Sequence, residues 1–229
     1  MNFLQEKENL ELKQVFNMYT REITGALIGT FILTIILFAP SFIFKLVLFG
    51  IFILAFIELC FLIRRPYWPS LLVIFFIFTS LFLVETYEAN RLLFLYSILI
   101  SVLNDSGAYY LGKKFGSRKV FSKTSPNKTL EGLISGILIS SCILYLINFQ
   151  EVFKFNINYL DNQNSFLFFI LLISSAVAVF GDYLESKIKR SADVKDSGSL
   201  LPGHGGILDR VDSHIFVIPV FFILVGAIL

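Results

Sequence analysis

Long runs of residues without a charge recur along this chain, and they constrain its fold more than any other feature. A helix needs about 20 mostly apolar residues to cross the hydrocarbon core of a bilayer. Only 16% of the 229 residues are charged, whereas 56% are hydrophobic. A soluble globular chain carries roughly a quarter charged residues, and a disordered chain is poor in hydrophobic ones. The sequence therefore predicts an all-α polytopic membrane protein. The uncharged runs are 23–44, 66–84, 132–150, 162–181 and 213–229.

Two further runs are apolar but less clear. One of them, 39–63, contains Lys45 and Glu58, and the other, 92–104, is short and ends at Asp105. Counting both gives about seven transmembrane helices, with ends placed to within a few residues. The predicted spans are 23–39, 42–63, 69–84, 91–104, 133–149, 165–181 and 214–229.

The distribution of Lys and Arg tests this count, because cytoplasmic loops of membrane proteins carry an excess of basic residues. With the N-terminus in the cytoplasm, segments 1–22, 64–68, 105–132 and 182–213 face inward and hold 16 of the 19 Lys and Arg. A wrong count would scramble that alternation. The pattern predicts the N-terminus inside, the C-terminus outside, and two long cytoplasmic loops, 105–132 and 182–213, that form the functional site.

The chain is predicted to form one transmembrane domain over residues 1–229, since no internal repeat and no separate soluble segment is evident. Residues 1–22 lack the apolar core and the small-residue cleavage site of a signal peptide. They are expected in the cytoplasm, either as an interfacial amphipathic helix or as a solvated leader. Cys60 and Cys142 both lie in apolar runs, which excludes a disulfide scaffold and favours buried apolar roles.

The loop at 182–213 carries the most chemical information. Acidic and basic residues alternate along it, and Pro202-Gly203 and Gly205-Gly206 cannot continue a regular helix. Paired glycines let a backbone approach a ligand closely, and their N–H groups can bind phosphate oxygens. The alternative is a solvated loop whose basic residues only set topology. The ordered mixture of Asp, Lys, His and Gly favours the functional interpretation.

Three carboxylates of this loop are placed to meet at the membrane face. Asp182 ends the sixth predicted span, and Asp209 and Asp212 share one face at the start of the last span. Ser186 and Lys189 follow Asp182 at helical spacing. Carboxylates beside phosphate-binding groups suit a hard divalent cation such as Mg²⁺.

Three other ionisable residues are also candidates. Asp105 ends an apolar segment, where an ionisable residue is costly and is a functional candidate, although it could only mark the membrane edge. Glu58 lies within a span, and a structural ion pair with Arg64 or Arg65 is favoured over a direct role. His204 lies between glycines and is interpreted as a ligand contact.

The last loop and four other segments together resemble a known family. The run in that loop begins Ser186-Lys187-Ile188-Lys189-Arg190, continues through Lys195-Asp196, and ends Pro202-Gly203-His204-Gly205-Gly206-Ile207-Leu208-Asp209-Arg210-Val211-Asp212. The other segments are 21–26, 105–109 with Gly112 and Phe115-Gly116, 125–132, and Gly181-Asp182 with Glu185-Ser186. This set resembles the motifs of phosphatidate cytidylyltransferases, also called CDP-diglyceride synthases. The chain is shorter than usual for that family, which leaves its helix count and its dimer contacts open.

The resemblance implies an activity and a setting. The reaction would be CTP + phosphatidic acid → CDP-diacylglycerol + pyrophosphate, in phospholipid biosynthesis, at the cytoplasmic face of the bacterial inner membrane. It implies Mg²⁺ or another divalent cation, with room for a second cation such as K⁺. It also implies a homodimer among membrane lipids, and no nucleic acid partner.

The resemblance also implies roles for residues by motif position. The predicted metal ligands are Asp182, Asp209 and Asp212. The predicted catalytic residues are Asp182, Asp209, Lys195, Asp196 and Arg210. The predicted substrate contacts are Asp105, Lys128, Ser186, Lys189, Arg190, His204, Gly205 and Gly206. Which basic residue meets CTP and which meets phosphatidic acid stays open.

Two other functions remain as alternatives. A CTP-dependent polyprenol or phytol kinase shares parts of the last loop but transfers the γ-phosphoryl group, and the complete run favours the cytidylyltransferase. A small polytopic transporter would also have several apolar spans. Transport needs polar groups along the midplane, whereas the charges here lie at one face, apart from Lys45, which disfavours a transporter.

Overall fold

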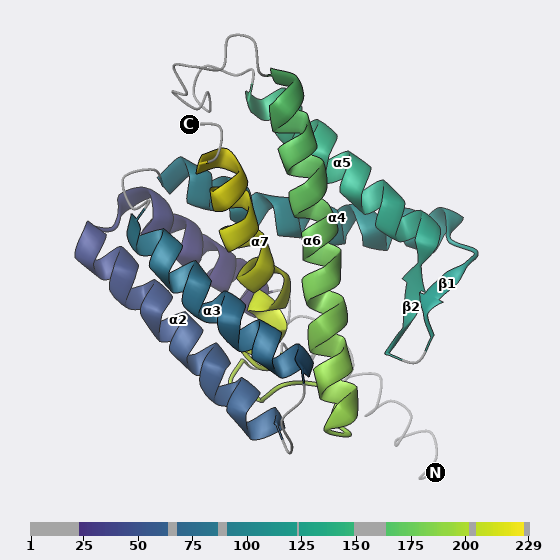
Figure 1. Ribbon diagram of the computed structural model, residues 1–229, viewed down its shortest axis with the longest axis horizontal. Helices are drawn as coiled ribbons and strands as arrows, with labels where there is room; N and C mark the ends of the chain where they lie inside the picture. Colours follow the sequence, from purple (N-terminus) through teal and green to yellow (C-terminus); the bar gives the residue numbers. More distant parts are fainter. Residues whose placement is uncertain are drawn as a thin grey trace, which may run out of the picture.

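Helices make up most of the structure, a computed structural model that describes residues 23–63, 68–86, 91–122, 124–148, 164–201 and 205–226. The predicted leader 1–22 lies outside the described residues. In chain order the described helices are Ile23–Phe38, α2 (Ser41–Leu62), α3 (Trp68–Thr86), α4 (Arg91–Phe115), α5 (Leu130–Asn148), α6 (Asn164–Ser191) and α7 (Leu208–Gly226). Each overlaps one of the predicted spans, and the all-α prediction is confirmed (Figure 1).

Two helices extend further than predicted. α4 continues past residue 104 to Phe115, and α6 continues past residue 181 to Ser191. In α6, apolar residues recur at helical spacing beyond the predicted end, and two of them, Leu184 and Ile188, are buried. The prediction of two long loops was therefore wrong in part, because the first part of each is helix.

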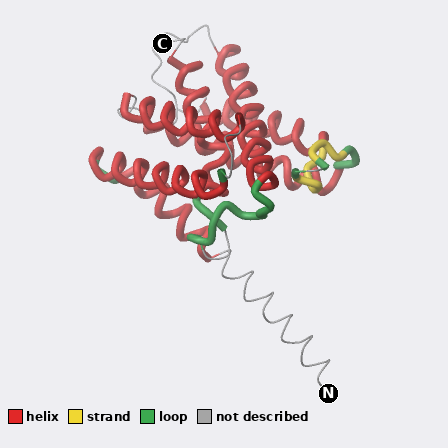
Figure 2. The backbone as a smooth tube through the Cα atoms, turned by 60° about the horizontal axis from the view of Figure 1, so that its bottom comes forward, coloured by secondary structure: helices red, strands yellow, loops and turns green. Residues whose placement is uncertain are grey.

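The remainder of the first loop is a β-hairpin, which the all-α prediction missed. β1 (Lys119–Phe121) pairs antiparallel with β2 (Ser125–Thr129). The two strands stand at one side of the helices in Figure 2. Phe121 packs on Tyr183 of α6, with 4.6 Å between ring centroids. Thr129 then caps α5 by accepting a hydrogen bond from Gly132 N–H at 3.2 Å, so the hairpin is fixed to both α5 and α6.

Glycines bring α4 and α5 into close contact beside this hairpin. A Cβ placed on Gly112 would lie 3.2 Å from Gly132 Cα, and one placed on Gly107 would lie 3.2 Å from Gly136 Cα. Small residues let helix backbones approach closely in a membrane. These motif glycines therefore set the crossing of two helices.

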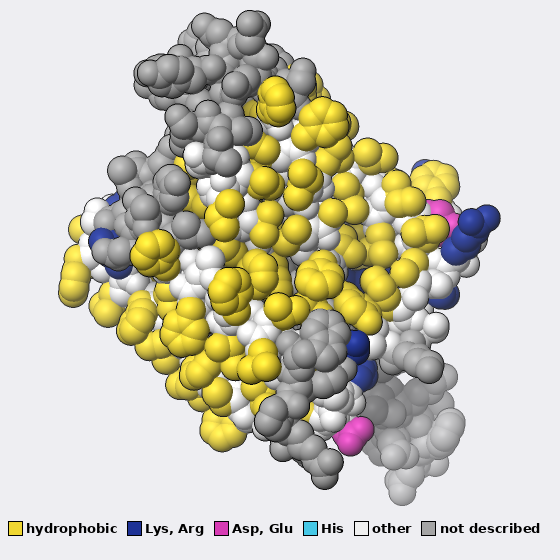
Figure 3. All heavy atoms as spheres, viewed as in Figure 1, with side chains coloured by type: hydrophobic (Ala, Val, Ile, Leu, Met, Phe, Trp, Pro, Cys, Tyr) yellow, Lys and Arg dark blue, Asp and Glu magenta, His cyan; other side chains and the backbone are white. Residues whose placement is uncertain are grey.

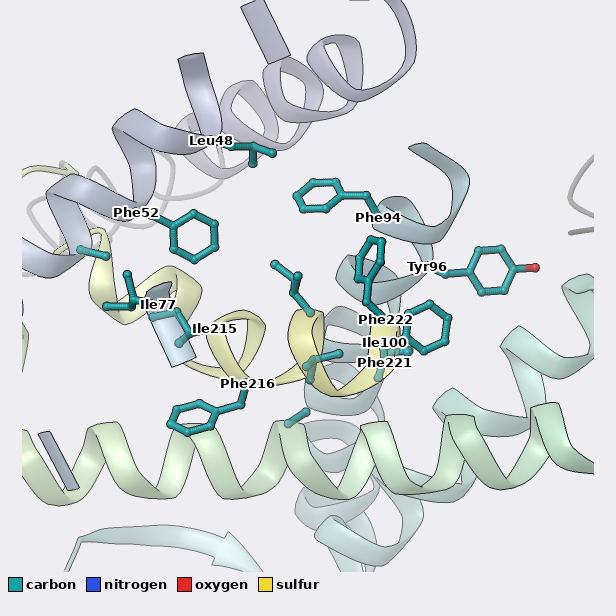
Figure 4. Packing of buried hydrophobic residues seen from close by; sticks show 14 of the residues in the cluster. Leu48, Phe52, Ile77, Phe94, Tyr96, Ile100, Ile215, Phe216, Phe221 and Phe222 are labelled. Atoms are coloured by element: carbon teal, nitrogen blue, oxygen red, sulfur yellow. The ribbon is translucent and has the colours of Figure 1, made fainter. Parts of the chain in front are cut away.

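The hydrophobic core surrounds α7. Ile215 and Phe216 of this helix are 0% and 1% exposed. Figure 4 shows them in one cluster with Phe52 of α2, Ile77 of α3 and Ile100 of α4. Because several helices pack on α7, its position determines where the charged residues of its first turns lie.

A proline inside α7 leaves one buried carbonyl without its helical partner. Pro219 has no N–H, so the carbonyl of Ile215, four residues earlier, cannot form its usual hydrogen bond. In a membrane such a group needs another donor. The hydroxyl of Ser80 in α3 is 0% exposed and donates to Ile215 O at 2.9 Å. This hydrogen bond joins α3 to α7 at the point where the helix is interrupted.

Three of the described helices are long and apolar enough to cross a bilayer, judged by length and composition. They are Ser41–Leu62, Leu130–Asn148 and Phe166–Ser191, and two shorter apolar helices are Ile23–Phe38 and Pro69–Phe82. Figure 3 shows hydrophobic side chains over most of the viewed face, with charged side chains mainly toward its edges. Such a surface fits lipid, and the chain is an integral membrane protein. The count of seven crossings stays a prediction.

Ser80→Ala is expected to lower the free energy of unfolding by roughly 1 kcal/mol, because the Ile215 carbonyl would lose its donor. The measurement is thermal unfolding of the purified protein in detergent. Thr79→Ala is the matched control, since the Thr79 hydroxyl donates to Phe75 O within its own helix and its loss should change Tm less. Equal shifts for the two variants would contradict the role given to Ser80.

Candidate functional site

Charged side chains from four elements gather where α6 and α7 meet the hairpin. Residues three and four apart share a helix face, which aligns the acidic and basic residues near the end of α6. The start of α7 adds two carboxylates. We call the group the charged cluster, and it consists of Asp105 of α4, Lys128 of β2, Asp182, Glu185 and Lys189 of α6, and Asp209 and Asp212 of α7.

Two lysines hold the carboxylates of the charged cluster. Lys128 forms an ion pair with Asp182, which joins the hairpin to α6. Lys189 Nζ lies 2.7 Å from Glu185 Oε2 on its own helix and 2.7 Å from Asp209 Oδ1 on α7. The Glu185 and Asp209 side chains are 2% and 5% exposed. Such buried charges depend on their partners, because an unpaired ion is costly away from water.

Burial changes the proton affinity of Lys128, which lies outside the helices. Burial lowers its pKa, because the charged form loses its hydration. The carboxylates of Asp105, Asp212 and Glu185 oppose that shift without cancelling it. The positive charge of Lys128 therefore depends on the carboxylates that surround it.

Asp209 closes the loop that joins α6 to α7. Its carboxylate accepts hydrogen bonds from Ser197 N–H at 2.9 Å and from Gly206 N–H at 2.8 Å. Burial raises the pKa of Asp209, but its hydrogen bonds outweigh burial and hold the pKa below the usual range. Gly205 has a φ of 85°, and a Cβ there would lie 2.6 Å from Asp209 Oδ2. Glycine is thus needed at this position for the loop to close on the carboxylate.

A second buried carboxylate, Glu58 of α2, holds the start of α7. It is 5% exposed and accepts hydrogen bonds from Ser197 Oγ at 2.8 Å, from Ile207 N–H at 3.0 Å and from Leu208 N–H at 2.8 Å. The first N–H groups of a helix have no partner within the helix, and the helix dipole favours a negative charge beside them. Glu58 is therefore a cap for α7 that comes from a distant helix.

The loop after α6 was predicted to bind phosphate through its N–H groups, but carboxylates of the protein occupy several of these groups. Its N–H groups at Ser197 and Gly206 donate to one carboxylate, and those at Ile207 and Leu208 donate to another. A phosphate would have to displace a carboxylate to reach these groups. His204 lies outside the described residues. Arg64 and Arg65, the predicted ion-pair partners of Glu58, also lie outside them.

The other predicted residues near the end of α6 and in the loop after it are mostly exposed. Lys195 and Asp196 lie exposed in the loop. Arg190 is also exposed and donates to two backbone carbonyls, one in the hairpin turn and one just after α6, at 3.3 and 3.0 Å. Ser186 lies beside the charged cluster, with its hydroxyl 3.5 Å from Asp182 Oδ1. Arg190 thus ties the hairpin to the loop, and a phosphate contact at this residue stays a prediction.

A polar cavity of about 650 Å³ opens beside the charged cluster. Its volume lies within the range of ligand pockets, roughly 300–1,000 Å³. Residues of α4, the hairpin, α5 and α6 form its wall, and charges of both signs line it. The charged residues are Asp105, Lys113, Lys119, Lys128 and Asp182. A cavity of this kind suits a ligand that carries both charge and hydrogen-bonding groups.

The predicted metal ligands Asp182, Asp209 and Asp212 all belong to the charged cluster. The first two are paired with different lysines, and in the described part of the chain no group of three or more His, Cys, Asp or Glu is placed to hold a metal ion. The cluster nevertheless contains five carboxylates and only two ammonium groups, and the buried Glu185 Oε1 has no hydrogen-bond partner among the described residues. This donor set fits a hard divalent cation in kind, and the ligand assignment stays a prediction.

The sequence-based prediction did not give the contacts of two residues of this site. Glu185 lies three residues after Asp182 and four before Lys189, so the helical spacing that groups those two residues also includes it. The charge of Glu58 within a span marks it as a candidate, but no spacing indicates its partners, because the groups that it binds lie 139 to 150 positions later in the chain.

The fold and the site together define an α-helical integral membrane protein with a charged, hollowed site formed by the ends of several helices. Comparison with known proteins agrees with this description, since the model of the cytidylyltransferase family matches residues 67–228. The chain belongs to the cytidylyltransferase family, which confirms the predicted relationship.

Individual relatives differ in how much of their length is matched. A protein of Rickettsia typhi named phosphatidate cytidylyltransferase is 35% identical over 223 residues, which cover 95% of this chain and 96% of the relative. Proteins of the same name from Bacillus subtilis and Staphylococcus aureus are 44% and 42% identical over 131 and 149 residues. Those matches cover 57% and 63% of this chain but only 46% and 53% of the relatives, so the chain spans about half the length of these two.

Glu58→Gln is expected to loosen the start of α7. Glutamine keeps the size of the side chain but turns an NH₂ group toward groups that are themselves donors, at a cost of roughly 1–3 kcal/mol for a donor left unsatisfied. Hydrogen exchange at the Ile207 and Leu208 amides should become faster, and the Tm of the purified protein should fall. Asp193→Asn is the control, because Asp193 is exposed in the loop after α6. Unchanged amide exchange in Glu58→Gln would show that Glu58 does not cap this helix.

Proposed function

We propose that this chain transfers CMP from CTP to phosphatidic acid and releases CDP-diacylglycerol and pyrophosphate, a step of phospholipid biosynthesis. The observation that carries the proposal is the match to the Rickettsia typhi protein, named phosphatidate cytidylyltransferase, over 95% of this chain. The charged cluster and the polar cavity beside it support the proposal, because they offer basic residues to a ligand rich in phosphate.

The proposed reaction requires no nucleophile from the protein. A phosphate oxygen of phosphatidic acid attacks the α-phosphorus of CTP, and the bond from that phosphorus to the oxygen bridging the β-phosphate breaks. Pyrophosphate leaves with the electron pair of the broken bond. Positioning of the two substrates and neutralisation of phosphate charge then supply most of the catalysis.

Lys128 and Lys189 are the basic residues best placed for this neutralisation. Lys128 lines the polar cavity, and Lys189 is held between Glu185 and Asp209. A lysine fixed by carboxylates presents its charge in a set direction, so less freedom is lost when substrate binds. We assign the nucleotide phosphates to the polar cavity on this basis.

The charged cluster is also where a divalent cation would bind, because carboxylates outnumber ammonium groups there. Asp182, Asp209 and Asp212 would hold the ion, since Mg²⁺ prefers oxygen ligands of this kind. The ion would supply additional neutralisation of the phosphate charge during the transfer. A second cation such as K⁺ is part of the same proposal.

We further propose that the protein lies in the bacterial inner membrane as a homodimer, with the N-terminus and the site on the cytoplasmic side and the C-terminus outside. The guanidinium of Arg91 donates hydrogen bonds to the carbonyls of Ile36 and Ala39. The start of α4 therefore lies beside the end of helix Ile23–Phe38, which supports a chain path that brings both to the same face of the membrane. Because CTP is cytosolic and phosphatidic acid is anchored in the leaflet, a site at the cytoplasmic face is accessible to both.

The test is incubation of the purified full chain with phosphatidic acid, Mg²⁺ and CTP labelled at the α-phosphate. Label should enter a lipid that migrates as CDP-diacylglycerol, with release of an equal amount of pyrophosphate. Transfer of label from CTP labelled at the γ-phosphate would instead identify a lipid kinase and overturn the proposal. Absence of any labelled lipid would also overturn it.

Asp182→Asn and Asp209→Asn are each expected to lower turnover by roughly 100-fold or more, a loss of about 2.7 kcal/mol of transition-state stabilisation. The amide keeps the shape of the side chain but loses the charge that a lysine or a cation requires. If both residues act on one ion, the double variant should be little worse than either single variant. Turnover is measured in the assay with label at the α-phosphate.

Asp193→Asn is the control for these variants, since the Asp193 side chain is exposed and lies outside the charged cluster. Its turnover should stay within a fewfold of that of the unmodified protein. Loss of activity in Asp193→Asn together with normal turnover in Asp182→Asn would mean that the site has been assigned to the wrong carboxylates.

The orientation in the membrane is tested with alkaline phosphatase fusions, which are active only outside the cytoplasm. A fusion after Leu229 should be active, and a fusion within residues 113–128 should be inactive, because the basic hairpin is expected on the cytoplasmic side. The opposite pattern would refute both the orientation and the cytoplasmic placement of the site.

A further inference from the structure

The start of α7 borders a second cavity, of about 280 Å³, which shares no lining residue with the polar cavity. Helix Ile23–Phe38, α2, α4 and α7 form most of its wall, which is almost wholly apolar. Residues along the wall include Ile32, Val47, Ile51, Ile98 and Val211. Its volume is close to the lower end of the range for ligand pockets, about 300 Å³.

Two polar side chains of α7 line this apolar cavity. Arg210 and His214 are four residues apart and therefore share a helix face. Arg210 is exposed, and His214 Nδ1 is buried without a hydrogen-bond partner among the described residues. Asp209, the neighbour of Arg210, instead contacts Lys189 of α6. The first turn of α7 thus presents the carboxylate of Asp209 to the charged cluster and the guanidinium of Arg210 to the apolar cavity.

We propose that the apolar cavity binds an acyl chain of the phosphatidic acid substrate and that Arg210 binds the phosphate of this lipid. The inference rests on the proposed function and goes beyond it, because it divides the basic residues between the two substrates. Lys128, in the polar cavity, meets CTP, and Arg210 meets the lipid.

The two parts of this cavity match the two parts of an anionic phospholipid. The apolar wall resembles the hydrocarbon core that an acyl chain leaves, so the chain can enter the cavity without exposing its CH₂ groups to water. A guanidinium forms paired, charge-assisted hydrogen bonds with a phosphate. A nucleotide would find few hydrogen-bonding groups along this wall, and a neutral lipid would make no use of the charge of Arg210. Charge complementarity at Arg210 and apolar surface along the rest of the wall therefore favour a phosphate-bearing lipid.

Filling the apolar cavity should weaken binding of the lipid and not of CTP. Ile51→Trp enlarges a side chain of the wall, and Ile53→Trp, at a position 38% exposed on the same helix, is the matched control. With dioleoyl phosphatidic acid in mixed micelles, Ile51→Trp should raise the KM for lipid about tenfold and leave the KM for CTP within about twofold. Equal lipid KM values in the two variants would overturn the proposal.

A second cavity-filling variant controls for misfolding of Ile51→Trp, and a shorter lipid tests whether the effect depends on the length of the acyl chain. Val47→Phe acts at another position of the wall and should give the same selective rise in lipid KM if Ile51→Trp fails to fold. Dihexanoyl phosphatidic acid, whose chains are much shorter than oleoyl chains, should be affected less by either variant. An equal effect on short and long lipids would overturn the assignment of an acyl chain to this cavity.

The role of Arg210 is tested by removing its charge, and the KM for CTP serves as the internal reference. Arg210→Gln should raise the KM for both the long and the short lipid about tenfold, and Arg210→Lys should recover part of the loss. The KM for CTP should stay close to that of the unmodified protein. A rise in the KM for CTP with an unchanged lipid KM would reverse the proposed division of the basic residues.

A readout without turnover separates this inference from the proposed function. Phosphatidic acid with a diazirine in its acyl chain is bound to the full chain, irradiated, and mapped on the protein by mass spectrometry. Label should fall on helix Ile23–Phe38, α2 and α4, and excess phosphatidic acid should suppress it more than excess diacylglycerol does. CDP-diacylglycerol formation without this label would overturn the inference alone. Label without product would overturn the proposed function and leave the lipid site standing.

Discussion

Two buried carboxylates, Glu58 and Asp209, hold the loop between α6 and α7 in place, and the rest of the site depends on them. Ser197 connects the two, because its hydroxyl donates to Glu58 and its N–H donates to Asp209. A buried carboxylate without donors is costly, so the loop must bring its N–H groups to both acids. The start of α7 and the direction of the Asp209 carboxylate are therefore set together with the path of the loop.

Lys189 extends this arrangement from the loop to the charged cluster. It is bound by Asp209 of α7 and by Glu185 of its own helix, and its side chain is 13% exposed. Fixing a lysine between two acids costs little additional order once the acids are themselves fixed, whereas an isolated surface pair would gain little. The same acids leave the cluster with more negative than positive groups. A site of this composition is suited to a substrate that arrives with a cation.

The sequence predicts where the helices lie because a bilayer requires apolar segments, but it misses the ends of α4 and α6 because these helices continue as polar segments. The bilayer requires long apolar segments, so every described helix has a visible run. Beyond the apolar part, α4 and α6 continue as polar helices, where mean hydropathy falls. For α6, only the helical spacing of Leu184 and Ile188 indicates that the helix continues past Asp182. The strand Ser125–Thr129 contains no alternation of apolar residues that would predict a hairpin.

The site divides in the same way between local and distant contacts. Helical spacing places Lys189 near Asp182, and the start of the last span places Asp209, because those relations are local in the chain. The cap from Glu58 joins residues 149 and 150 positions apart, and only the packing of α2 against the start of α7 produces it. Spacing cannot report such a contact, and a charge inside a span indicates a function without naming its partner.

The rotation of α7 about its own axis relates the charged cluster to the apolar cavity, because Asp209 contacts Lys189 and Arg210 lines the cavity. Successive residues of a helix point about 100° apart, so Asp209 and Arg210 can serve different sites only while α7 keeps one rotation. Two contacts fix that rotation at different heights. Glu58 binds the N–H groups of the first turn, and the Ser80 hydroxyl binds the carbonyl of Ile215 that Pro219 leaves free. A small rotation of α7 about its axis would disturb both contacts and would move Asp209 and Arg210 together. The proposed division of the basic residues between the two substrates therefore depends on a helix start whose orientation is fixed from α2 at one point and from α3 at another.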